Sequence, residues 1–164
     1  MAQFGIFVAF GDNKSAKIKG NSAVAGYEDW VLGHSVQLNS RADRTDGPAG
    51  KTAKKVTAHV DGLSLMLHGG SATAEMYKTL FATTALAQVH IHQCLQPVDK
   101  AAKQAPDLVQ KIELKDVFIT SVSENWMPDG ERSVQVTLEF AHIMFTEGKK
   151  TADFTVRNLT KAGG

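Results

Sequence analysis

The chain has 164 residues, of which 43% are hydrophobic and 21% charged, the ordinary composition of one folded domain. Basic side chains number 18 and acidic ones 17, and this near balance gives no reason to expect nucleic acid or an anionic membrane as a partner. The single cysteine, Cys94, excludes an intrachain disulfide, and the short N-terminal apolar stretch lacks the basic region of a signal peptide. We therefore expect one domain, residues 1–164, that neither inserts into membranes nor uses a signal peptide for export.

Alternation of apolar and polar side chains predicts two strands near the N-terminus, at residues 4–10 and 30–38. Residues 11–26 lie between them, are rich in Gly, Lys, Asn and Ser, and predict a loop. Trp30 shares the parity of the apolar positions that follow it, so we expect it in the core.

Residues 40–54 show no periodic apolar pattern and predict a loop of roughly fifteen residues, a length at which loops are either functional or simply mobile. Charged side chains of both signs gather in this loop: Arg41, Asp43, Arg44, Asp46, Lys51 and Lys54.

A further strand is predicted over residues 56–67, with a change of parity at Gly62 that indicates a bulge or bend. Residues 71–86 form the one convincing helical segment. Ser71 is its candidate N-cap, and apolar side chains recur at a spacing of four.

Strands are also predicted over residues 89–94, 112–122, 134–140 and 154–156, with a register shift near Asp116 and a turn at residues 128–130. About seven or eight short strands with one helix predict a mainly β fold, a small antiparallel barrel or sandwich.

The polar face of the strand at residues 88–94 carries Gln88, His90, His92 and Cys94. The last three have the donor atoms of a zinc site, with a fourth ligand to come from His59 or His142. Cys94 beside a histidine is also compatible with a nucleophile, but no orienting group or oxyanion site accompanies it. A polar strand face is the better interpretation, and we expect no cofactor, no metal and no enzymatic activity.

Three stretches resemble one known family: the Glu-x-Trp passage within residues 26–32, the segment 112–123 and the strand 134–145. Over nearly the whole chain their order resembles that of the haemolysin-coregulated protein (Hcp) family of type VI secretion. The resemblance implies one β-barrel with a flanking helix, similar to phage tail tube proteins. It also implies hexameric rings that stack into the inner tube of a contractile machine. The partners implied are further copies of the chain, the sheath, the spike and small effectors. The protein would leave the bacterial cytoplasm through that machine.

In such a subunit, the loop 40–54 is the candidate arm between subunits, and its mixed charges suit a neighbour bearing the same surface. Gln88, His90, His92 and Trp126 are candidates for a lumen or interface face. The competing interpretations are a monomeric barrel that binds a small molecule or a metal, and a phage tail tube-like protein.

Overall fold

The computed structural model describes residues 3–11, 16–45, 55–96 and 105–156, and in these ranges it has eight strands and one helix. In chain order they are β1 (Gln3–Gly11), β2 (Ala16–Ile18), β3 (Val31–Thr45), β4 (Lys55–His68), α1 (Ala72–Phe81), β5 (Leu86–Gln96), β6 (Asp107–Trp126), β7 (Arg132–Glu147) and β8 (Lys150–Thr155).

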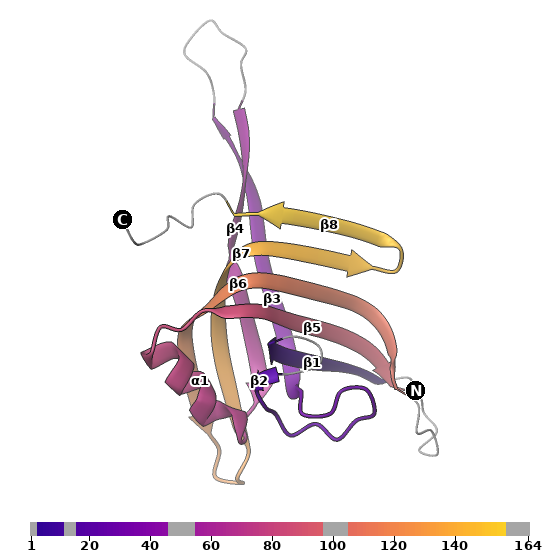
Figure 1. Cartoon of the computed structure of the whole chain (residues 1–164), viewed down its shortest axis with the longest axis vertical. Coiled ribbons are helices and arrows are strands. Elements are labelled where there is room, and N and C mark those ends of the chain that lie inside the picture. The colour runs from indigo at the N-terminus through magenta and orange to yellow at the C-terminus, as the bar shows by residue number, and fades with distance from the viewer. Residues whose placement is uncertain (1–2, 12–15, 46–54, 97–104, 157–164) are drawn as a thin grey trace, which may run out of the picture.

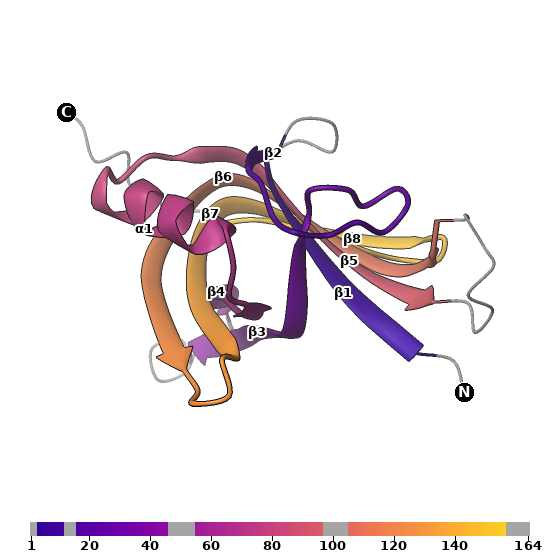
Figure 2. The same ribbon diagram turned by 90° about the horizontal axis from the view of Figure 1, so that it is seen from below.

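The strands close into an antiparallel barrel, which confirms the predicted fold class (Figures 1 and 2). Around the ring the order is β1, β3, β4, β7, β6 and β5, and β5 pairs again with β1. β2 adds to β1, and β8 adds to β7. Closure covers most strand edges, which is how small β proteins limit uncontrolled edge pairing.

Two irregularities predicted from parity are present in the strands. Gly62 has a φ of +85° and lies where the pairing of β3 with β4 shifts by one residue, so β4 bulges there. In β6, Asp116 has a φ of +53°, and the buried positions change from even to odd on its two sides. These breaks let long strands bend around the barrel while keeping their apolar side chains inside.

Apolar side chains fill the barrel, and a second, smaller cluster lies outside it. The interior contains Leu63, Leu65, Leu67, Leu114, Leu138 and further aliphatic residues. The outer cluster joins the other face of β1 to the segment that precedes β3, through Phe7, Ala9, Tyr27, Trp30 and Cys94. Trp30 is buried, as predicted, but in this outer cluster and not in the barrel.

The helix α1 ends at Phe81, five residues before the predicted end. Ser71 occupies the N-cap position, but its side chain makes no capping bond; its hydroxyl donates to Oδ1 of Asn21 at 2.7 Å. The predicted single apolar stripe is divided, since Met76 is buried against the barrel and Phe81 is 78% exposed.

The predicted loop 40–54 begins too early. β3 continues to Thr45 and pairs with β4 from Lys55, so residues 40–45 belong to a long hairpin that rises from the barrel (Figure 1). The side chains of residues 40–45 are mostly small or polar, so this part of the strand has no apolar periodicity in the sequence. Residues 46–54, with Asp46, Lys51 and Lys54, lie outside the described residues. The predicted loop 11–26 likewise contains a short strand, β2.

Candidate functional site

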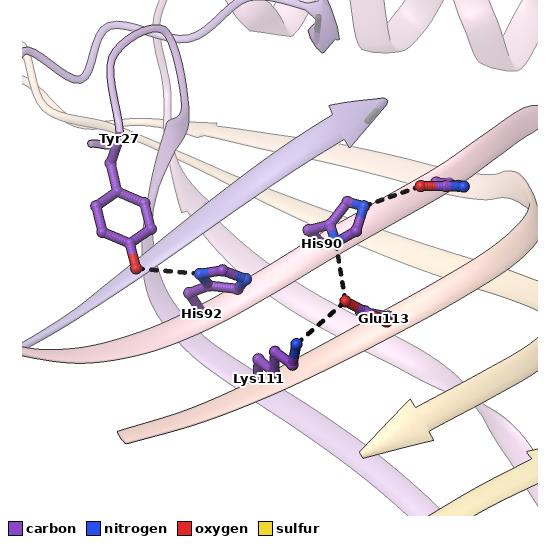
Figure 3. Close-up of polar contacts among 6 residues, drawn as sticks. Tyr27, His90, His92, Lys111 and Glu113 are labelled. Atoms are coloured by element: carbon purple, nitrogen blue, oxygen red, sulfur yellow. Dashed lines mark hydrogen bonds and ion pairs between the residues drawn. The ribbon is translucent and has the colours of Figure 1, made fainter. Parts of the chain in front are cut away.

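The polar face of β5 is covered by the segment before β3, and hydrogen bonds of Tyr27 with Cys94 and His92 join the two. Figure 3 shows the bond between Tyr27 and His92. The Cys94 thiol donates to the Tyr27 hydroxyl at 3.0 Å, and that hydroxyl lies 3.0 Å from Nδ1 of His92. Because the hydroxyl accepts from the thiol, its own proton is directed to Nδ1. The ring of Tyr27 also stacks on Phe7 with centroids 4.5 Å apart.

Burial keeps these three groups uncharged. It raises the pKa of the Cys94 thiol and of the Tyr27 hydroxyl, and it lowers the pKa of His92 to about 4, with smaller contributions from His90 and Lys111. Nε2 of His92 is buried and has no hydrogen-bond partner among the described residues. The cluster is therefore a neutral, buried network that fixes the covering segment on the barrel.

Beside it, His90 lies between two polar neighbours (Figure 3). Its Nε2 is 3.1 Å from Oε1 of Gln88, and its Nδ1 is 3.7 Å from Oε1 of Glu113 on β6. Lys111 Nζ lies 3.5 Å from the same carboxylate oxygen. Glu113 thus links a lysine to an imidazole that is only 5% exposed.

The structure places the three candidate zinc ligands on one side of β5, as predicted, but the Cys94 thiol and Nδ1 of His92 contact Tyr27, and His90 lies between Gln88 and Glu113. In the described part of the chain, no group of three or more His, Cys, Asp or Glu side chains is arranged to hold a metal ion. The Cys94 thiol is fully buried and its pKa is raised, so it has neither the charge nor the access of a nucleophile. The assignment of this face to a lumen or a subunit contact stays a prediction.

The projecting hairpin has two unlike faces. Beyond the bulge at Gly62, alternation puts Arg41, Asp43, His59 and Asp61 on one face. Arg41 Nε lies 3.6 Å from Asp61 and 3.9 Å from Asp43, and His59 Nε2 lies 3.3 Å from Asp43. Arg44 belongs to β3 by its backbone, but its side chain is outside the described set.

The other face of the hairpin carries small side chains, the apolar Ala42, Ala58 and Val60 together with Ser40, and it borders an open cleft, which we call the wedge. At Gly62 β4 leaves β7, and further along β7 the strand β8 takes the place beside it. The wedge between hairpin and β8 has a volume of about 570 Å³. Its apolar lining includes Ala42, Ala58, Val60, Phe145, Ala152 and Phe154, and Arg41 and Asp153 also line it.

A second exposed apolar feature lies at the turn between β6 and β7, which we call the knob, residues 126–127. Trp126 is 72% exposed and Met127 49%. Arg132 lies over the indole ring at 5.5 Å, and the indole N–H donates to Glu124. Trp126 is thus presented to solvent in a supported position. The sequence indicated an interface role for Trp126 only because this residue lies beside a predicted turn.

The described residues contain no helix of the length and apolar character that crossing a membrane requires.

The sequence matches no curated protein significantly. The fold, in contrast, is similar to many solved structures. One is a double mutant of Hcp1 from the E. coli EAEC 042 pathovar, at 14% identity and TM-score 0.72, covering 92% of this chain and 97% of that one. Another is Hcp1 from Salmonella typhimurium, at 18% identity and TM-score 0.71, with 94% and 95% covered. Hcp3 from Pseudomonas aeruginosa is a third, described as a secreted protein, at 14% identity and TM-score 0.59, with 96% and 99% covered.

At such low identity these structures establish the fold alone. The family model for the type VI secretion system effector Hcp adds sequence evidence, because it matches residues 7–146, which is most of the chain. The matched range begins within β1 and ends within β7, so it contains most of the closed ring together with the hairpin and the helix. The chain therefore belongs to the Hcp family of type VI secretion.

Proposed function

We propose that this chain is a structural subunit of the type VI secretion inner tube. Copies assemble head to tail into hexameric rings, the rings stack into a tube, and the lumen carries small effectors. Family membership supports the proposal. The sheath and the spike are its partners in the machine, and it is made in the bacterial cytoplasm and exported without a signal peptide.

The observation that carries the proposal is the free-standing hairpin. Beyond the bulge at Gly62, residues 40–45 of β3 and 55–60 of β4 pair only with each other among the described strands, so the hairpin leaves the barrel as a two-stranded ribbon. A ribbon of two strands is marginally stable in water by itself. One face of this ribbon is apolar and the other carries both charge signs, and a neighbouring copy can cover the first and pair with the second.

The direct test measures assembly. Light scattering after gel filtration, over a range of concentrations, should give a mass of six chains, and negative-stain microscopy should show rings and stacked rings. A stable monomer at the highest concentration would refute self-assembly and favour a barrel that acts alone.

A hairpin variant tests the role of the arm. Thr45 and Lys55 are paired residues, so residues 46–54 can be replaced by Asn-Gly, the preferred sequence of a two-residue hairpin turn. We expect an unchanged melting temperature and weaker assembly. As a second variant, Arg41→Glu leaves the hairpin at full length and reverses one charge of its charged face. Normal rings and tubes from both variants would show that the hairpin is not the arm.

A further inference from the structure

We infer that the knob of one copy, Trp126 and Met127, occupies the wedge of the next copy. This inference rests on the proposed self-assembly and names the two surfaces that meet in one of its contacts. Both are single, local features, so the inference can fail while assembly itself stands.

The wedge has the size and lining of a site that receives an apolar group. A cavity of about 150 Å³ lined by aliphatic and aromatic side chains holds benzene, so the wedge, at about 570 Å³, has room for an indole and a thioether chain together. It is bordered by the apolar face of the hairpin and by Phe145 and Phe154. An open apolar surface of this kind is costly in water unless something covers it.

The knob is the matching feature on the same chain. Trp126 has the largest apolar side chain among the strongly exposed residues, and Met127 follows it at the tip of the same hairpin. Indole side chains are enriched among the residues that dominate interface energies. The contacts with Arg132 and Glu124 hold the ring in place before binding, which reduces the entropy lost on docking.

The occupant must come from another copy. The knob precedes β7, which begins at Arg132, whereas the wedge lies near the other end of β7, at Phe145. The path along the strand from Arg132 to Phe145 is thirteen residues, or roughly 40 Å. Figure 1 shows the turn between β6 and β7 at the end of the molecule opposite the projecting hairpin. A knob and a wedge that lie apart on one chain form a head-to-tail contact, which repeats from copy to copy.

The charged side chains on both surfaces are compatible with docking of the knob in the wedge. The ionisable residues that line the wedge are Arg41, His59 and Asp153, and Arg41 also lies beside Asp43 and Asp61 on the hairpin. The knob is flanked by Glu124 and by Arg132. Each surface therefore offers both charge signs, so neither repels the other through one uniform sign.

Disulfide cross-linking tests the contact directly. Met127 and Ala152 are both exposed, and the native Cys94 is fully buried, so the double variant Met127→Cys/Ala152→Cys has two reactive thiols. Under mild oxidation we expect a ladder of dimers, trimers and higher multimers on a non-reducing gel. The matched control, Ala74→Cys/Ala152→Cys, keeps the native knob and places its second thiol on the exposed side of α1, and it should give no ladder.

A second variant, Trp126→Ala/Met127→Ala, should raise the concentration for half-assembly at least tenfold while the melting temperature stays within a few degrees of wild type. Rings of the cysteine variant without a ladder would refute the inference and leave the proposed function standing, with some other partner for the wedge. Unchanged assembly of the alanine variant would also refute the inference and leave the proposed function standing. A wild-type chain that stays monomeric would refute both.

Discussion

Acid should destabilise this fold through His92, and the effect can be isolated by one substitution. The pKa of His92 is lowered from 6.5 to about 4, first by burial and then by the nearby His90 and Lys111, while Glu113 opposes the shift. In the unfolded chain the imidazole binds a proton near its usual pKa. The unfolded state therefore takes up more protons than the native state at every pH between these two values.

The sign and size follow from that difference. Because the folded pKa is the lower one, this contribution to stability is fully present above pH 6.5 and is lost as the pH falls toward 4. A difference of 2.5 pH units corresponds to about 3 kcal/mol at 1.36 kcal/mol per unit, which is an upper bound for a side chain that is not fully buried. Relative to the total stability of a small domain, roughly 5–15 kcal/mol, that is a large fraction.

The assay is urea unfolding, followed by circular dichroism, at half-unit steps from pH 4 to 7.5. His92→Gln retains a carbonyl oxygen that can accept from the Tyr27 hydroxyl but does not titrate, so its free energy of unfolding should fall less steeply than that of wild type below pH 6.5. His68→Gln is the matched control, because the pKa of His68 is also lowered by burial but its ring is exposed and solvent screens it. Parallel pH profiles for wild type and His92→Gln would refute the reasoning.

Three further experiments test the packing. Tyr27→Phe removes the hydroxyl that links a buried thiol to a buried imidazole, and it should lower the free energy of unfolding by about 1–2 kcal/mol in urea titrations; no change would mean that the hydrogen bonds contribute nothing net. Met76→Ala should lower the free energy of unfolding by about 2–4 kcal/mol, because it leaves a cavity between the helix and the barrel. Phe81→Ala, at a side chain that is 78% exposed, should change the free energy of unfolding by less than about 0.5 kcal/mol. Equal losses would mean that the helix packs on the core with a different face. Gly62→Ala should destabilise more than Gly130→Ala: both glycines have positive φ, but a Cβ at Gly62 would meet the Leu138 carbonyl oxygen at 3.2 Å and one at Gly130 meets nothing within 4 Å. Equal melting temperatures of these two variants would show that the Leu138 carbonyl oxygen does not hinder a side chain at position 62.

Local periodicity was sufficient to predict the β content, the single helix and the bulge at Gly62, because strand side chains alternate with a period of two whatever they pack against. The resemblance of three stretches and of their order to one family was sufficient to predict the fold, which the family model and the solved structures confirm.

Other features were decided only when distant segments met. Residues 40–45 have few apolar side chains and form a strand because residues 55–60 pair with them. Cys94 lies on a face that reads as polar, yet it is fully buried, because Tyr27 and its segment cover it from more than sixty positions away. The wedge exists because β4 leaves β7 at a bulge and β8 replaces it. Alternation fixes which side of a strand a residue occupies, whereas the layer that covers that side depends on contacts between segments far apart in the chain.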